Sequence, residues 1–201
     1  SFFRNREATN YGDLYLYGGL FDSMAYLLNR ISPAGEYESR HLLNALFGLA
    51  GVIGVFKLGR SLGGPLAGFL AALFLVLTPR YYGHSFNNPK DIPFAVFYLY
   101  SIYYMVRSVD FLPRIPRGLV LKLGVFIGLA MGVRVGGMVL LGYLALFLII
   151  GEICRLASGR NRVQSASGLF LDLGVLAARF LVIGAVAYGV MLIFWPWGQV
   201  K

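Results

Sequence analysis

The chain has 201 residues, of which 58% are apolar and only 13% are charged, about half the charged share of an ordinary soluble domain. A soluble domain of this size has too little interior to bury so much apolar surface, and the same composition excludes intrinsic disorder. A single Cys excludes an internal disulfide framework. The composition therefore predicts an integral membrane protein.

The net charge of +9 is typical of a nucleic-acid-binding protein, but its distribution indicates a membrane topology instead. Five of the nine acids lie in the first 38 residues, and after Ser39 there are 15 Lys and Arg against four acids. Most of these bases gather in short gaps between apolar stretches, which is the pattern of cytoplasmic loops. We therefore expect membrane lipids as partners and no nucleic acid.

Residues 1–39 are the least apolar part of the chain and are predicted to form a first loop on the non-cytoplasmic side. The chain opens on Ser-Phe-Phe without an initiator Met or a signal-peptide pattern, which predicts an internal segment of a longer protein. Residues 14–30 place apolar side chains at helical spacing among several Tyr, which predicts a juxtamembrane amphipathic helix. Such a helix either lies at the membrane–water boundary or packs, facing water, on the membrane domain.

Residues 40–201 are predicted to form a transmembrane bundle of about six spans. The apolar stretches occupy residues 41–58, 62–78, 92–106, 119–151 and 173–195. The fourth stretch exceeds the ~20 residues that cross a bilayer once, so we predict a hairpin broken near residues 134–137. The basic gaps lie at 57–60, which we expect to be a tight turn, at 107–122 and at 155–162. The positive-inside rule places these gaps in the cytoplasm, and alternation places residues 79–91 and Arg134 on the opposite face.

A ridge of four glycines repeats every four residues within the fourth apolar stretch, at Gly124, Gly128, Gly132 and Gly136. Small residues at this spacing let two helix backbones approach closely in lipid, so the ridge predicts a tight helix contact. Room for a lipid tail is a weaker alternative.

The connector at residues 79–93 concentrates polar groups on the predicted non-cytoplasmic side. It is stiffened by three prolines, and it contains Arg80, His84, Asn87, Asn88, Lys90 and Asp91. Charged groups at a membrane face are costly without a partner, so this loop is the first candidate for a functional site.

Each group in the connector has a functional and a structural interpretation. Asp91 is a catalytic or metal-binding carboxylate, or it caps the helix that it begins. Lys90 and Arg80 suit an anionic ligand such as a phosphate, or they pair with lipid headgroups or with Asp91. His84 is an acid–base group or metal ligand, or an ordinary hydrogen-bonded residue. Asn88 binds sugar hydroxyls or shapes a turn.

Arg134 is the second candidate, because it interrupts an otherwise apolar stretch. An intramembrane Arg is expected to face the bundle interior with an anionic partner, and the alternative is a side chain that extends to the interface. The flanking glycines favour a partner or a ligand phosphate. We therefore predict that Arg134 and Asp91 meet at the same end of the bundle and bind an anionic lipid head there.

Several motifs in order resemble the dolichyl-phosphate-mannose protein mannosyltransferase-like family of bacterial membrane glycosyltransferases. They are residues 38–46, 58–64, 79–80 with 88–93, 128–134 and 195–197. The resemblance implies a GT-C-like fold, which is an all-α polytopic transmembrane helix bundle. It also implies a multi-pass protein of the bacterial inner membrane that transfers a sugar from a polyprenyl-phosphate donor to a hydroxyl of a protein, lipid or glycan acceptor.

The resemblance also implies roles for individual residues. The family's second acid corresponds to Asp91, and the bases that hold the donor phosphate correspond to Lys90, Arg134 and, less closely, Arg80. The family's main catalytic acid is expected upstream of Ser1. A requirement for a divalent cation is left open. The alternative function is a non-enzymatic transporter or flippase-like subunit, with Arg134 and Asp91 lining a substrate path.

Overall fold

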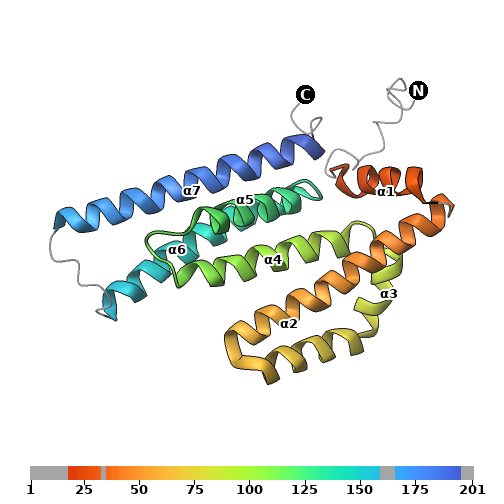
Figure 1. Cartoon of the computed structure of the whole chain (residues 1–201), viewed down its shortest axis with the longest axis horizontal. Helices are drawn as coiled ribbons and strands as arrows, with labels where there is room; N and C mark the ends of the chain where they lie inside the picture. Colours follow the sequence, from red (N-terminus) through yellow and green to blue (C-terminus); the bar gives the residue numbers. More distant parts are fainter. Residues whose placement is uncertain (1–17, 33–34, 159–165, 196–201) are drawn as a thin grey trace.

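The protein is a bundle of long helices in the computed structural model, which describes residues 18–32, 35–158 and 166–195 (Figure 1). The elements are α1 (Leu20–Ile31), α2 (Glu36–Leu77), α3 (Pro79–Asn87), α4 (Asp91–Val109), α5 (Arg117–Met131), the short 3₁₀ helix η3 (Val135–Met138), α6 (Val139–Ala157) and α7 (Ala166–Phe194). No strand occurs in the described ranges. The predicted all-α polytopic bundle is therefore confirmed.

Four segments are long and apolar enough to cross a membrane: Glu36–Leu77, Asp91–Val109, Val135–Ala157 and Ser167–Phe194. The first of them is bent into two arms, and α5 is shorter, with 15 residues. The helices thus follow the predicted apolar stretches, while the division into about six spans stays a prediction.

The bend in α2 lies at Gly63 and Gly64, and not at residues 57–60 where we expected a turn. Gly64 has a φ of 81°, a left-handed conformation that favours glycine, and Pro65 begins the next arm. The basic segment remains helical because long Lys and Arg side chains reach polar surroundings without any break in the helix. The arms touch closely, since a Cβ added at Gly68 would lie 2.7 Å from the Phe56 carbonyl oxygen.

The predicted glycine ridge forms a close contact between α5 and α7. A Cβ added at Gly124 would lie 2.7 Å from the side chain of Val186, and one at Gly128 would lie 2.5 Å from the Ala187 carbonyl oxygen. The tight helix contact is therefore confirmed. Gly136 lies beyond the helix, in η3, where its neighbour is Phe94 of α4.

Replacing Gly128 by Leu is expected to destabilise the bundle by about 1–3 kcal/mol, because the added side chain forces α5 and α7 apart. The matched control is Gly142→Leu on α6, where a Cβ meets nothing within 4 Å. Thermal unfolding of both variants in detergent micelles measures the difference. An equal loss in the two variants would contradict the close contact.

The two ends of the bundle are formed by different segments of the chain (Figure 1). One end gathers α1, α3, the connection from α5 to η3 and the last turn of α7. The opposite end gathers the bend of α2, the connection from α4 to α5 and the last turn of α6. These are the basic gaps that the sequence grouped together, so the bundle separates the candidate residues from most of its bases.

The described part of the predicted amphipathic helix is α1. It buries Leu20, Phe21 and Ala25 and exposes Tyr26 and Leu27. The Gly19 N–H donates to the Phe194 carbonyl oxygen at 2.9 Å, which ties the start of α1 to the end of α7. Residues 14–17 of the predicted helix lie outside the described residues.

Arg155, in the last turn of α6, forms ion pairs with two acids, Glu152 and Asp172. Its Nε donates to Glu152 Oε2 at 2.9 Å, and its guanidinium pairs with Asp172 of α7 at 2.7 Å. Glu152 is only 3% exposed, so the cluster joins α6 to α7 inside the bundle. The sequence analysis grouped Arg155 with a basic gap and did not predict this pairing, although only four acids follow Ser39 as possible partners.

Candidate functional site

The predicted connector is largely helical. Pro79 occupies the first turn of α3, and the chain then stays helical to Asn87. Tyr81 donates from its hydroxyl to the Gly48 carbonyl oxygen of α2 at 2.7 Å, and Ser85, one turn later, packs on the same glycine. Burial raises the pKa of the Tyr81 phenol, so the hydroxyl remains a donor. The sequence analysis did not predict this helix, which packs on α2, because the segment is polar.

Asn88 caps the start of α4, a role that we had considered for Asp91. Its Oδ1 accepts from the backbone N–H groups of Asp91 at 2.9 Å and Lys90 at 3.3 Å. With Pro89 following it, Asn88 has the position and the hydrogen bonds of a helix N-cap. This places Asp91 in the first turn, where a negative charge is stabilised by the helix dipole.

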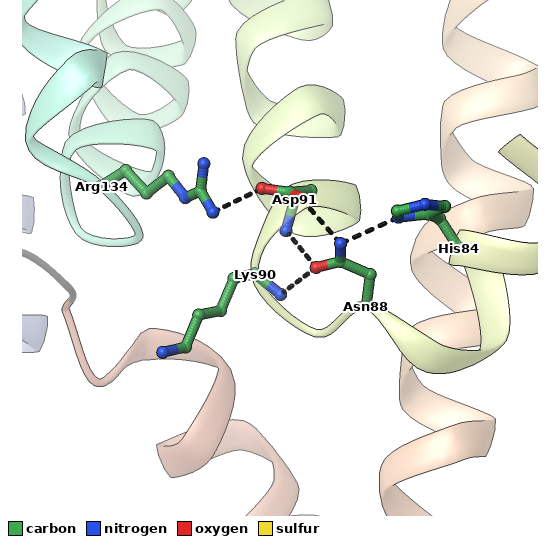
Figure 2. A network of polar contacts seen from close by, with 5 residues as sticks. All are labelled: His84, Asn88, Lys90, Asp91 and Arg134. Atoms are coloured by element: carbon green, nitrogen blue, oxygen red, sulfur yellow. Dashed lines mark hydrogen bonds and ion pairs between the residues drawn. The ribbon is translucent and has the colours of Figure 1, made fainter. Parts of the chain in front are cut away.

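Asp91 and Arg134 form an ion pair, with 2.5 Å between Asp91 Oδ1 and a terminal guanidinium nitrogen (Figure 2). The second carboxylate oxygen, Oδ2, accepts from Asn88 Nδ2 at 2.7 Å. Arg134 lies in an extended conformation between α5 and η3, which directs it toward α4. The prediction that these two residues meet at one end of the bundle is confirmed.

The ion pair is open to a ligand. The side chains of Arg134 and Asp91 are 33% and 46% exposed. An ion pair this exposed contributes about 0–1 kcal/mol to stability, so the bundle does not depend on it to fold. A guanidinium offers several donors in one plane and a carboxylate oxygen has two lone pairs, so both groups keep capacity for further hydrogen bonds.

His84 and Asn44 extend the network to α2. The Asn88 amide nitrogen donates to His84 Nδ1 at 2.8 Å, so the proton of the neutral imidazole lies on Nε2. Asn44 is 1% exposed and donates to the His84 carbonyl oxygen at 2.9 Å. All four hydrogen bonds of the Asn88 side chain are thus internal, which suits support of Asp91 rather than contact with a sugar. Asn44 thereby joins α2 to α3.

The remaining predicted residues differ in their placement. Lys90 lies beside the ion pair, and Figure 2 shows its side chain directed away from the Asp91 carboxylate. Arg80 lies on α3 one turn before His84, is exposed, and takes no part in this network among the described residues. No group of three or more His, Cys, Asp or Glu side chains gathers within the described ranges.

An apolar groove follows α4 away from the ion pair. It begins at Phe94, in the turn after Asp91, and contains almost no polar surface. Its lining residues are Leu58, Phe94, Ala95, Tyr98, Leu99 and Ile102. The Asp91 carboxylate and the Arg134 guanidinium therefore lie at one end of an apolar surface that runs along α4.

Comparison with known proteins identifies the family of the chain. No curated protein and no solved structure matches the chain. A family model described as dolichyl-phosphate-mannose-protein mannosyltransferase matches residues 24–178. The match covers most of the chain and includes Asn44, His84, Asn88, Asp91 and Arg134. The chain, a helix bundle with an Asp–Arg pair at one end, therefore belongs to the dolichyl-phosphate-mannose-protein mannosyltransferase family of membrane glycosyltransferases.

Proposed function

We propose that the protein transfers a sugar from a polyprenyl-phosphate donor to an acceptor hydroxyl on the non-cytoplasmic face of the membrane. The observation that carries the proposal is the exposed Asp91–Arg134 pair. The pair holds a carboxylate and a guanidinium side by side from segments that are far apart in the sequence. The family favours this function over the transporter alternative.

In the proposed reaction the acceptor oxygen bonds to the anomeric carbon of the sugar while the bond from that carbon to the phosphate oxygen breaks. Asp91 takes part as a carboxylate that accepts the hydroxyl proton. Arg134 and Lys90 stabilise the departing polyprenyl phosphate, whose charge grows as the bond breaks. Attack opposite to the leaving group inverts the configuration at the anomeric carbon.

The position of the apolar groove supports a lipid-linked donor. A polyprenyl chain attached to a phosphate at Arg134 meets an apolar surface one helical turn from Asp91, beginning at Phe94. A nucleotide sugar has no apolar tail to occupy that surface. The donor class is therefore expected to be recognised by both its phosphate and its tail.

A reconstitution assay tests this function. The full chain in lipid vesicles is given a polyprenyl-phosphate-linked sugar or the matching nucleotide sugar, with and without a divalent cation, and release of polyprenyl phosphate or nucleotide is measured. We expect turnover and saturable binding with the lipid-linked donor only. Equal use of the nucleotide sugar, or no affinity for polyprenyl phosphate, would refute the proposed donor.

A further inference from the structure

His84 lies in the middle of a chain of hydrogen bonds that runs from α2 to Asp91. On the α2 side, the buried Asn44 donates to the His84 carbonyl oxygen at 2.9 Å. On the other side, Asn88 Nδ2 donates to His84 Nδ1 at 2.8 Å and to Asp91 Oδ2 at 2.7 Å (Figure 2). The amide nitrogen thus gives one proton to the imidazole and the other to the carboxylate.

The Asn88 amide cannot turn over, because its oxygen is bound as well. Oδ1 accepts from the backbone N–H groups of Asp91 at 2.9 Å and Lys90 at 3.3 Å. A turned amide would direct its own N–H groups at these two donors and its oxygen at the Asp91 carboxylate. Nδ2 therefore faces His84 and Asp91 for as long as Asn88 caps α4.

The position of His84 is set by the packing of α3 on α2. The Tyr81 hydroxyl donates to the Gly48 carbonyl oxygen at 2.7 Å, and a Cβ added at Gly48 would lie 2.7 Å from the side chain of Ser85. These contacts lie on both sides of His84 along α3, and its side chain is half-buried. A change at Nδ1 therefore acts on Asn88, because α3 has no room to move toward α2.

The hydrogen bond from Asn88 requires a neutral imidazole. A neutral imidazole has one nitrogen that accepts, whereas a protonated imidazole has two N–H donors and no acceptor. The His84 nitrogen that accepts is Nδ1. Protonation of His84 therefore places a second N–H against the Asn88 N–H group and breaks this hydrogen bond.

The other histidine of the chain, His41 on α2, has the opposite arrangement. Its Nδ1 lies 2.7 Å from the Phe86 carbonyl oxygen, which can only accept, so Nδ1 carries the proton. This hydrogen bond persists when the ring gains a second proton on Nε2. The two histidines therefore differ in tautomer and in the effect of protonation on their contacts.

The charged groups around His84 come from α2, from α4 and from the connection that carries Arg134. Asp91 is paired with Arg134, and Arg40 of α2 is paired with Asp22 of α1. Histidine is the side chain that ordinarily changes charge between pH 5 and 8, so His84 and His41 are the groups that substitution has to separate. The other titratable groups of these elements near His84 are Tyr37 of α2, Lys90 of α4, and Arg80, Tyr81 and Tyr82 of α3 itself.

We propose that neutral His84 is a positioning residue for Asp91, which it orients through Asn88, and that protonation of His84 lowers sugar transfer by releasing Asn88. The inference rests on the proposed function, because it concerns the orientation of the proposed proton acceptor. It gives His84 no contact with the sugar or the phosphate. The site is thereby made sensitive to acid through a residue that does not touch the substrate.

The first test does not require transfer. The full chain, labelled with ¹⁵N at its histidines, is studied by NMR in detergent micelles at roughly pH 7.5, above the ordinary histidine range. We expect the ring proton on Nε2 in His84 and on Nδ1 in His41, with the signals assigned from His84→Asn and His41→Asn. Asn88→Ala is expected to shift the His84 signals only. A proton on His84 Nδ1, or no response to Asn88→Ala, would overturn the proposal whether or not the chain transfers sugar.

The second test compares transfer from a polyprenyl-phosphate-linked sugar at roughly pH 7.5 and roughly pH 5.5. His84→Asn places an amide oxygen where Nδ1 lies, and this acceptor gains no proton between the two values. We expect it to keep the turnover of the wild type at the higher pH and to lose less at the lower pH. His84→Leu has no acceptor and is expected to be slower by roughly three- to tenfold at the higher pH, the effect of one hydrogen bond.

The matched control is His41→Asn, which is expected to keep the acid response of the wild type. Titration of Asp91 or of the donor acts on wild type and variants alike, so it cancels when their responses are compared. Equal acid losses in the wild type and His84→Asn, or loss of the acid response in His41→Asn, would contradict the role of His84. Expected tautomers without transfer at either pH would instead refute the proposed function, and with it the effect on turnover.

Discussion

Asp91→Asn is expected to lower the rate of sugar transfer by roughly 10²–10⁴-fold, the range that a positioned acid–base group contributes. The substitution preserves the size of the side chain and removes its negative charge, so the acceptor proton has no carboxylate to receive it. Because Asp91 is half-exposed, the variant is expected to fold. Transfer from a polyprenyl-phosphate-linked sugar in vesicles measures the effect.

The matched control for Asp91 is Asp110→Asn, which removes an exposed carboxylate at the other end of the same helix. It is expected to leave transfer unchanged. Asn88→Ala is expected to transfer sugar at a rate between those of the wild type and Asp91→Asn, because it removes the hydrogen bond to Asp91 Oδ2 and keeps the carboxylate. Wild-type turnover by Asp91→Asn would remove Asp91 from the mechanism and leave it a structural partner of Arg134.

Arg134→Gln is expected to reduce transfer by roughly 10²–10³-fold, comparable to the loss of one donor that stabilises a developing negative charge. The guanidinium is a planar, permanently charged group that matches two phosphate oxygens at once. Arg134→Lys keeps the charge but not this geometry, so its rate should fall between those of the wild type and the Gln variant.

Steady-state kinetics separate the two ways in which Arg134 acts. A lower kcat indicates stabilisation of the leaving phosphate, whereas a higher KM for the donor with unchanged kcat indicates binding of the ground state only. Arg107→Gln, an exposed base near the far end of α4, controls for general charge effects. If that control loses as much activity as Arg134→Gln, the effect is one of overall charge and not of the ion pair.

The network around Asp91 explains which parts of the site were predictable. The polar connector and the isolated Arg134 are visible in the sequence, because charge is rare and costly in an apolar chain. The helix α3 was not visible, because its polar residues conceal the periodicity of Tyr81 and Ser85. The role of Asn88 was also open, since only the backbone geometry shows that its side chain caps α4 and holds Asp91.

Of the two bends that the sequence predicted, one is confirmed and the other was wrong. The sequence predicted the break near Arg134 from its charge and glycines, and the structure places the end of α5 and η3 there. It predicted a turn at residues 57–60 from their charge, and that prediction was wrong. The bend occurs at Gly64, where the backbone adopts a left-handed conformation, because charge at a membrane boundary does not by itself interrupt helical hydrogen bonding.

The sequence alone determined the membrane class, the helical architecture and the glycine contact surface of α5. These properties depend on hydropathy and on the spacing of residues along a single helix, which are local quantities. Only the tertiary structure decided that Asp91 pairs with Arg134, that Glu152 and Asp172 share Arg155, and that Asn44 of α2 bonds to the backbone of His84. Nearly all of those contacts join different segments of the chain, and they depend on how each helix is rotated and shifted against its neighbours, which no local pattern specifies.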